Sequence, residues 1–491
     1  MTRTKERGRR AAAPAQSPFD PSRPLLQLSP TDAFTIADAC EGVQIFGSTG
    51  SGKTSGSGAA LARAMLRAGF GGLVLTAKPD ERALWERYCR ETGRSESLII
   101  FNTDSPHRFN FLDYELKRPG GGVTDNIVDL FTTAIAAARG SDQTSRQDPY
   151  WGLALEQLLR NAVDLLRHST GSVSLPEMTE VIRSAARSPE QAEDEEKWQA
   201  ESFCAQCLDK MLKGLTPDKA PPDIYETAAY WIREYPGLPD KTRASVVSTF
   251  TTMADGFLRG PIRELFCTTT SIVPELTHHG AVLLIDLPIK THHRVGRFAQ
   301  VIWKTLWQRA TEVRDVAVNP RPVFLWADEA QSFATAKDAD FQATARSSRA
   351  CTVYLTQNIS NYRAAMGGGR DAEASVDSFL GNLQTKVFHA NGDAVTNEWA
   401  SKTIANDWAR HSSTSVGEQH DPKTGSPRPS ASANTSESFD AQAPPVAFTM
   451  LSKGGRVNRG RVEAIVFQGG RVWKATGRNH IRVTFQQGGA A

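Results

Sequence analysis

An eight-residue loop near the N-terminus has the residue types and spacing of a phosphate-binding site. Residues 47–54 read GSTGSGKT, in which glycines recur before a Lys-Thr ending. Glycines let backbone N–H groups turn toward an anion, and a helix that starts there presents its positive end. Lys53 would reach the outer phosphates of a nucleotide, and the Thr54 hydroxyl would ligate Mg²⁺. Chance gives this pattern in only about 0.02 of chains this long. It predicts a nucleotide site formed by Gly47, Ser48, Thr49, Gly50, Ser51, Gly52, Lys53, Thr54 and Ser55.

A nucleotide hydrolase also needs acids beside the metal and the attacking water. The apolar run PVFLWA, residues 322–327, ends in Asp328 and Glu329. One acid at the end of a buried strand can hold the Mg²⁺ shell, and a second can polarise water. An Asp-Glu pair after a strand is a common loop by itself, but together with the phosphate loop it becomes the expected partner. We therefore assign Asp328, with Thr54, to Mg²⁺ and Glu329 to the water, and we expect ATP and Mg²⁺ as cofactors.

Three further polar residues flank the next apolar run, residues 351–356. Gln357 follows it, where ligand-facing groups of a parallel sheet gather, and either senses the γ-phosphate or caps the strand. Arg346 and Arg349 precede it, and each either ends a solvated helix or supplies the cation that ring ATPases take from a neighbouring subunit. The residues alone do not choose between the two arginines. The expected catalytic set is Lys53, Glu329, Gln357, Arg346 and Arg349.

A parallel sheet is needed to bring these residues together. Short runs that are apolar on both faces alternate with helical stretches, which is typical of an α/β fold with helices on both sides of a mainly parallel sheet. Between residues 120 and 265 the strands stop and apolar residues recur at helical spacing. We therefore predict an α/β P-loop NTPase domain with an inserted all-α domain. The expected strands lie at residues 43–46, 72–77, 97–101, 281–287, 322–327, 351–356 and 385–389.

Composition changes several times along the 491 residues. Residues 411–441 are rich in Ser, Thr, Pro and Gly, which predicts a flexible linker. Residues 461–477 read as a hairpin that turns at Gly469 and Gly470. Basic residues cluster at both ends although the net charge is only +3; they serve either solubility or contact with nucleic acid or a membrane surface. The expected divisions are a disordered basic tail (1–22), the nucleotide-binding domain in two parts (23–119 and 266–410), the all-α domain (120–265), the flexible linker (411–441) and a β-rich segment (442–491).

The cysteines and apolar runs indicate the compartment. Six scattered cysteines fit a reducing cytosol. Cys204 and Cys207 could hold zinc, but no second pair has suitable spacing, so free thiols are favoured. No signal peptide is recognisable, and no run approaches the roughly 18 apolar residues of a membrane span. We expect a cytoplasmic protein that attaches to the inner membrane only through a partner.

Seven motifs in this order resemble those of TraG/TraD-like coupling ATPases of conjugative type IV secretion, in the FtsK/HerA group of DNA pumps. They are FGSTGSGKTS, LVLTAKPDE, DPYW, LLIDLP, FLWADEAQSF, LTQN and GNLQTKVF, and the resemblance spans about residues 27–485. It implies a RecA-like nucleotide domain and a homohexameric ring around single- or double-stranded DNA, assembled with ATP or DNA. The AKPDE loop, residues 77–81, matches a family loop at the C-terminal edge of the strand after the P-loop helix.

Family roles carry over onto single residues. The resemblance makes Asp328 and Glu329 a Walker B pair and Gln357 the sensor glutamine. It places Arg346 or Arg349 near the arginine that acts across the subunit boundary.

The expected function is an ATP-driven DNA motor that delivers DNA to a transfer machinery, with a relaxosome or a membrane channel subunit as a further partner. Membrane-bound relatives begin with transmembrane helices, and this sequence shows none, so a membrane subunit would recruit it. Three alternatives stay open: a soluble HerA/FtsK-like ATPase of a DNA-processing or defence system, a nucleotide-dependent scaffold that does not translocate, and a protein-remodelling ring ATPase. Glu329 favours hydrolysis, because a pure switch does not need a water-polarising acid.

Overall fold

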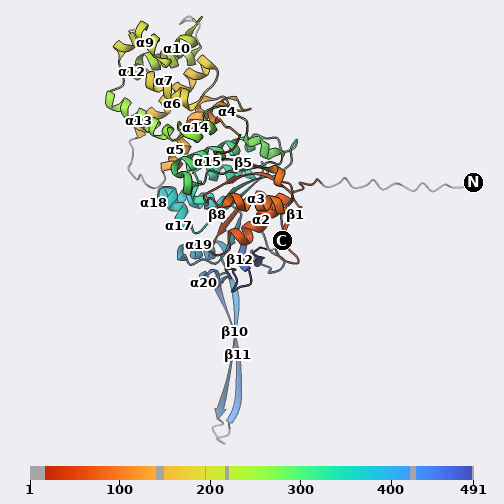
Figure 1. Ribbon diagram of the computed structural model, residues 1–491. Helices are drawn as coiled ribbons and strands as arrows, with labels where there is room; N and C mark the ends of the chain where they lie inside the picture. The colour runs from red at the N-terminus through yellow and green to blue at the C-terminus, as the bar shows by residue number, and fades with distance from the viewer. Residues whose placement is uncertain (1–16, 140–148, 194, 216–220, 421–426, 489–491) are drawn as a thin grey trace, which may run out of the picture.

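The computed structural model describes residues 17–139, 149–193, 195–215, 221–420 and 427–488 (Figure 1). Its centre is a nine-stranded sheet in the order β13-β12-β9-β3-β8-β7-β4-β6-β5. The strands from β9 to β5 in that order are parallel, while β12 and β13 join antiparallel. The expected α/β fold with a mainly parallel sheet is confirmed. The parallel strands are β3 (Val43–Phe46), β4 (Gly71–Leu75), β5 (Leu98–Phe101), β6 (Val282–Ile285), β7 (Val323–Ala327), β8 (Ala350–Thr356) and β9 (Thr385–Phe388).

The parallel strands are mostly apolar because helices cover both of their faces, although a few polar side chains such as Gln44 and Lys386 are buried there. Successive side chains of a strand point to opposite faces. Leu73 and Leu325 accordingly lie in one apolar core, whereas Val74 and Phe324 lie in the other. Each of the seven expected strands overlaps one of these parallel strands, because a strand buried on two faces is visible in the sequence as a short, nearly continuous apolar run.

Helices form a layer on each side of the sheet. One face is covered by α2 (Ala59–Arg67) and α3 (Glu81–Glu91), which share the core that contains Val74. The small ribbon of β1 (Pro24–Gln27) and β2 (Ala33–Thr35), with α1 (Ile36–Cys40), adjoins them. Five helices contribute to the core on the opposite face: α15 (Ile289–Glu312), α16 (Lys337–Ala345), α17 (Ile359–Ala365), α18 (Gly369–Asn382) and α19 (Ala394–Ile404).

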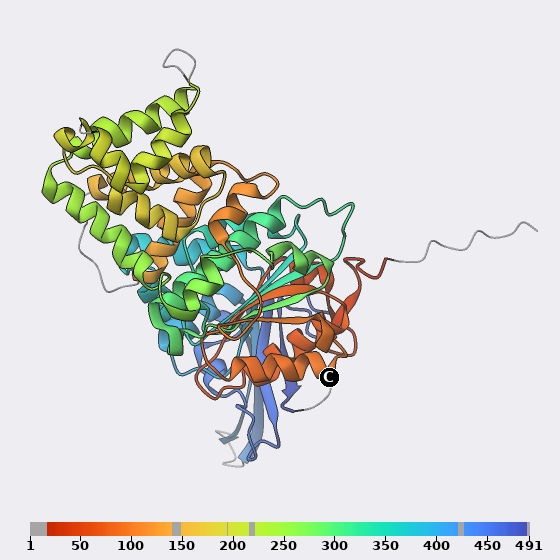
Figure 2. The same ribbon diagram turned by 45° about the horizontal axis from the view of Figure 1, so that its top comes forward.

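A helical domain is inserted between β5 and β6, as expected, and lies above the sheet in Figures 1 and 2. Its apolar core is continuous with one face of the sheet, where Phe101 packs against Phe266 with ring centroids 5.4 Å apart. Arg309 of α15 ties the domain down through Glu115 at 3.0 Å and Asp129 at 2.6 Å. Its helices are α4 (Phe111–Lys117), α5 (Thr124–Arg139), α6 (Pro149–Thr170), α7 (Leu175–Ser184), α8 (Pro189–Glu193), α9 (Glu195–Glu201), α10 (Phe203–Leu212), α11 (Pro222–Ala229), α12 (Tyr235–Gly237), α13 (Asp240–Asp255) and α14 (Gly260–Phe266).

Among the residues that the structure describes, no helix has both the length and the apolar character needed to cross a membrane.

Within the segment expected to be a flexible linker, residues 411–441, the described residues 411–420 and 427–441 instead belong to a long antiparallel hairpin. Its strands are β10 (Asn406–His420) and β11 (Pro427–Ala441), which pair with each other along their whole length. The prediction from composition was wrong, because a Ser- and Thr-rich segment with few apolar residues can still pair its backbone N–H and C=O groups in a β-ladder. Residues 421–426 and the basic residues 1–16 lie outside the described residues.

The C-terminal hairpin is real, but its second strand begins later than expected. β12 (Arg461–Gln468) pairs with β13 (His480–Gln486), not with residues 471–477. The intervening segment is a loop in which Trp473 is fully buried in a core. Asp32 fixes the same loop by accepting hydrogen bonds from the backbone amides that follow this tryptophan, at 2.7 and 2.9 Å. A short helix, α20 (Pro445–Thr449), precedes the hairpin.

Candidate nucleotide-binding and hydrolysis site

The phosphate loop leaves the end of β3 and enters a π-helical turn, η1 (Thr54–Gly58), that leads into α2. Neighbouring strands fix its first residues. Gly47 N donates to Thr356 O at 3.3 Å, and Ser48 N donates to Ala390 O at 3.1 Å. Those carbonyls stand at or just beyond the ends of β8 and β9, the two neighbours of β3 in the sheet. The strand order therefore sets where the loop begins.

Glycines inside the loop are required by conformation and by close approach. Gly50 and Gly52 have φ angles of 74° and 88°, a conformation that favours glycine. A Cβ on Gly52 would lie 2.6 Å from Val462 Cγ1, and one on Gly47 would lie 2.3 Å from Ser51 Oγ. The Ser51 hydroxyl is buried and has no hydrogen-bond partner among the described residues. An unsatisfied buried hydroxyl in a glycine-rich loop at the start of a helix fits a phosphate ligand.

The two expected Mg²⁺ ligands meet although 274 residues separate them in the chain. Thr54 Oγ1 donates to Asp328 Oδ2 at 2.7 Å. Asp328 follows β7 directly and is only 4% exposed. A hydroxyl beside a buried carboxylate supplies the oxygen donors that Mg²⁺ takes in nucleotide sites, so these residues fit the ion.

Glu329 is held in an unusual backbone conformation with both carboxylate oxygens engaged. Its φ of 52° and ψ of 47° are left-handed, which is uncommon outside glycine. Lys78 Nζ lies 2.8 Å from Oε1, and Gln331 Nε2 donates to Oε2 at 3.0 Å. Burial opposes ionisation of Glu329, but these two hydrogen bonds and the charge of Lys53 hold its pKa below the ordinary value. Glu329 is therefore an ionised carboxylate that can accept a proton from water.

The loop that follows β4 brings a cation and a second acid to the same edge. Burial disfavours the charge on Lys78, but the hydrogen bond to Glu329 and the nearby charge of Asp328 raise its pKa. Glu81 accepts a hydrogen bond from Ala77 N at 3.0 Å. Burial and the charge of Asp328 raise the pKa of Glu81 to about 8. The sequence identified this loop only by its resemblance to a family motif and assigned Lys78 no chemical role.

A cavity of about 660 Å³ opens beside the phosphate loop, and its lining includes Gly50, Lys53, Thr54, Lys78, Glu329 and Gln357. Gln357 thus lies at the cavity, and its backbone carbonyl accepts a hydrogen bond from Asn391 Nδ2 at 2.9 Å. Sequence reasoning missed Gln331, whose amide oxygen accepts from Thr356 Oγ1 at 2.7 Å. Gln331 therefore links Glu329 to the end of β8. Its position two residues after Glu329 was the available signal.

The two candidate arginines lie at the opposite edge of the sheet. Both precede β8, which runs parallel to β3. The seven residues of β8, or roughly 20 Å, separate these arginines from the edge that carries the phosphate loop. Arg349 Nη1 donates to the carbonyls of Phe19 and Pro320 at 2.9 and 2.8 Å, so this side chain fixes local structure. The Arg346 side chain is 72% exposed and pairs with Glu41 at 3.0 Å. Neither arginine joins the site of its own chain, and Arg346 is the one whose side chain faces solvent.

The C-terminal hairpin packs directly on the phosphate loop, a contact that the sequence did not reveal. Val462 of β12 contacts Gly52, as described above, and Gln487 Nε2 donates to Ser55 Oγ at 2.7 Å. His389, just after β9, connects the two parts: its Nε2 lies 2.7 Å from Ser57 Oγ, and its Nδ1 lies 3.0 Å from the Glu463 carbonyl. Burial lowers the pKa of His389 to about 4, so the ring is neutral. The phosphate loop is therefore linked to β12 by direct packing and by hydrogen bonds through His389.

A family model described as the TraM recognition site of TraD and TraG matches residues 322–441. The matched segment runs from the start of β7 to the end of β11 and contains Asp328, Glu329 and Gln357. The resemblance to TraG/TraD coupling proteins is therefore confirmed. No curated protein matches this chain significantly.

Solved structures of coupling proteins share the fold. An unbound bacterial conjugative coupling protein, TrwBdeltaN70, is 14% identical with a TM-score of 0.58, over 92% of this chain and 87% of that chain. The plasmid coupling protein TrwB in complex with ADP and Mg²⁺ is 14% identical with a TM-score of 0.57, over 94% of this chain and 88% of that chain. TrwB with the non-hydrolysable GTP analogue GDPNP is 14% identical with a TM-score of 0.59, over 93% of this chain and 89% of that chain. This chain therefore has the fold of a coupling-protein-like NTPase.

Proposed function

We propose that this chain is an ATP-hydrolysing DNA translocase that works as a homohexameric ring and passes DNA to a transfer machinery. The observation that carries the proposal is the hydrogen bond of 2.7 Å between Thr54 and Asp328, with Glu329 lining the same cavity. A phosphate loop, a metal-binding pair and an ionised acid are the parts that nucleotide hydrolysis requires.

Each residue of the site has a role in this proposal. Lys53 binds the outer phosphates, and Thr54 and Asp328 would hold Mg²⁺, which when bound neutralises charge on those phosphates. Glu329 orients the attacking water and accepts its proton, and Gln357 senses the γ-phosphate. TrwB, which shares the fold, has been solved with ADP and Mg²⁺, and this supports the same cofactor class here.

Neither candidate arginine reaches the site of its own chain, which fits a ring in which such a residue acts on a neighbouring subunit. Ring ATPases complete the charge around the γ-phosphate with an arginine from the next subunit. We assign this role to Arg346 in preference to Arg349, because the Arg346 side chain is exposed whereas Arg349 is bound to carbonyls of its own chain.

A basic loop at the C-terminus offers a route from nucleotide to DNA. Arg456 and Arg459 are exposed just before β12, and the exposed Arg461 is its first residue, next to Val462, which contacts the phosphate loop. A displacement of the phosphate loop would therefore be transmitted to side chains that can bind DNA phosphates. This contact favours a DNA motor over a nucleotide-dependent scaffold that leaves its partner unmoved.

The test measures the ATPase rate of the full chain without DNA, with single-stranded DNA and with double-stranded DNA of several lengths. We expect DNA to raise the rate, and we expect Glu329→Gln to abolish the DNA-stimulated part. Glu96→Gln, a change at an exposed acid away from the phosphate loop, serves as the matched control. An ATPase that DNA of either kind leaves unchanged, but that an unfolded protein stimulates, would replace the DNA motor with a protein-remodelling ATPase.

A further inference from the structure

The hairpin β10–β11 forms an arm that leads away from the body of the molecule (Figure 1). Its strands pair from Asn406 with Ala441 to His420 with Pro427, without a break in register. Fifteen residues at about 3.4 Å each give strands roughly 50 Å long. Each strand pairs only with the other within the described chain, so the outer edge of each is without a strand partner there.

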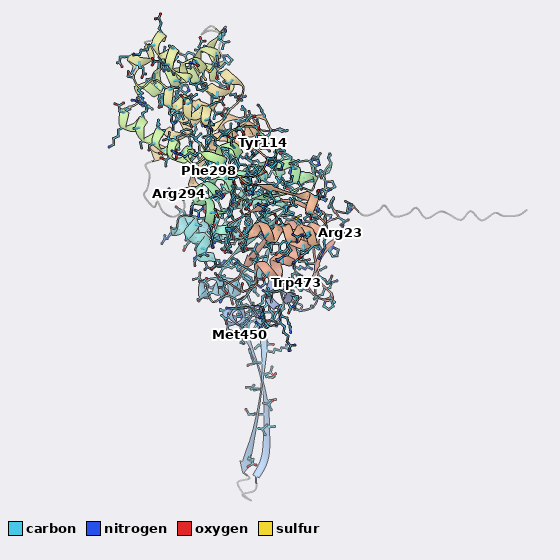
Figure 3. The ribbon with its side chains drawn as sticks, in the orientation of Figure 1. Arg23, Tyr114, Arg294, Phe298, Met450 and Trp473 are labelled. Atoms are coloured by element: carbon cyan, nitrogen blue, oxygen red, sulfur yellow. The ribbon has the colours of Figure 1, made fainter. Side chains whose placement is uncertain are left out.

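The two faces of the arm differ in chemistry. Trp408, Val416 and Phe439 share one face by register, and their exposed fractions are 68%, 78% and 57%. Trp408 and Phe439 pack together with ring centroids 5.5 Å apart. The opposite face carries small polar side chains such as Ser413 and Asn434. Met450, also exposed at 73%, lies near the root of the arm in Figure 3. This face thus presents apolar side chains to solvent at the root of the arm and again at Val416, with Arg410, Glu437 and small side chains between them.

The middle of each strand of the arm lacks the usual protection against pairing with another strand, whereas the strand ends carry charges and prolines. Exposed edge strands are normally blunted by charged residues, proline or a bulge. Residues 412–417 and 431–436 contain no charge and no proline, and the register shows no bulge. A two-stranded hairpin on its own is also only marginally stable in water. Both features indicate that further strands complete this sheet.

We propose that the arm pairs edge to edge with the arms of neighbouring copies of this chain, β10 of one copy running antiparallel beside β11 of the next. This inference rests on the ring assembly of the proposed function. Repeating the register of the hairpin would set Arg410 beside Glu437 of the next copy, the same opposite charges that pair at 2.7 Å within one chain. It would also set Trp408 beside Phe439 of the next copy, the same pair of rings that packs together within one chain.

Pairing of β10 with β11 of the next copy suits a ring better than pairing of β10 with another β10. A contact between unlike strands is heterologous and can be repeated from subunit to subunit until the ring closes. A contact of β10 with another β10 is two-fold and ends after two chains. The arms would thus hold subunits together at a distance from the nucleotide site, while nucleotide-dependent contacts change at the body.

Cysteine cross-linking between two differently tagged full-length chains tests the proposal. One chain carries Thr414→Cys in β10, and the other carries Ala433→Cys in β11, two positions that lie opposite each other in the register. With ATP and DNA present, mild oxidation should cross-link the mixture, and neither variant alone. The six native cysteines are buried, so the wild-type chain gives the background. A mixture of Ala433→Cys with Ser95→Cys, an exposed position outside the arm, controls for random collision.

Other results would overturn the proposal. Cross-linking of Thr414→Cys with itself would indicate two-fold pairing of β10. Cross-linking no stronger than in the mixture of Ala433→Cys with Ser95→Cys would contradict any pairing between arms. Amide hydrogen exchange of wild-type residues 412–417 provides a test without substitutions: assembly should slow exchange at the outer-edge amides at least tenfold, and unchanged exchange contradicts the pairing. Mass measurement and ATPase assays on the same samples separate the two proposals. A ring with DNA-stimulated ATPase but no cross-link removes the arm contact alone, whereas absence of both the ring and the ATPase removes the proposed function as well.

Discussion

Lys78 Nζ lies 2.8 Å from Glu329 Oε1, so the acid proposed to polarise water is paired with a cation from a different strand end. The two residues are 251 positions apart in the chain. Gln331 occupies the other carboxylate oxygen. We therefore propose that Lys78 is a positioning residue that keeps Glu329 ionised and oriented toward the cavity.

Lys78→Met should slow ATP hydrolysis by about tenfold or more, since an unpositioned base is a poorer proton acceptor. Because the hydrogen bond from Lys78 lowers the pKa of Glu329, its loss should raise that pKa. The acidic limb of the profile of kcat against pH should therefore move to higher pH. Lys290→Met, at a second lysine that lines the same cavity, is the matched control. An unmoved acidic limb would show that Lys78 does not act through Glu329.

Glu329→Gln should preserve ATP binding and lower kcat by about a hundredfold or more, because the amide cannot accept a proton. Equilibrium binding of a fluorescent ATP analogue and steady-state hydrolysis would be measured on the same preparation. Hydrolysis at the wild-type rate would remove Glu329 from the role of the base.

Mixed rings should reveal whether Arg346 acts across the subunit boundary. Lys53→Ala removes the phosphate-binding charge and Arg346→Ala removes the proposed trans cation, so each variant should be inactive alone. A mixture should recover ATPase activity, because some interfaces then combine an intact Lys53 with an intact arginine. Arg370→Ala, at an exposed arginine of α18, should behave like wild type. Full activity of Arg346→Ala alone would contradict the assignment.

The three exposed arginines at and just before the start of β12 should contribute to the salt dependence of DNA binding. Each phosphate contact adds roughly 0.9 to the slope of log affinity against log salt for double-stranded DNA. Replacing Arg456, Arg459 and Arg461 together with Ala should flatten that slope by up to about 2.7. Fluorescence anisotropy with a labelled duplex at several salt concentrations measures it, and an unchanged slope would assign these charges to solubility.

His389 should make the protein sensitive to mild acid. Burial lowers its pKa to about 4 from 6.5, so the unfolded chain binds a proton on this ring between those pH values and the folded chain does not. The free energy of unfolding should therefore fall as pH decreases from about 6.5 to about 4, by about 3 kcal/mol for this group. Urea unfolding across this range should show a smaller loss for His389→Gln than for wild type. His168→Gln, at an exposed histidine, should follow the wild-type curve.

Local sequence was enough to predict the sheet and the phosphate loop. A strand buried on both faces is apolar at most positions, and a phosphate loop needs glycines within a few residues of one another. Both signals lie in short segments, such as residues 43–58 and 322–329. They do not depend on how the strands are ordered in space.

Only the tertiary structure decided which distant residues complete the site. Lys78 reaches Glu329 because β4 and β7 are neighbours, and Val462 reaches Gly52 because β12 extends the sheet beside β9. The hairpin β10–β11 escaped prediction for the same reason: pairs such as Arg410 with Glu437 become visible only when the register of two strands is known. Contacts between residues hundreds of positions apart follow from strand order and register, which no short segment of the sequence encodes.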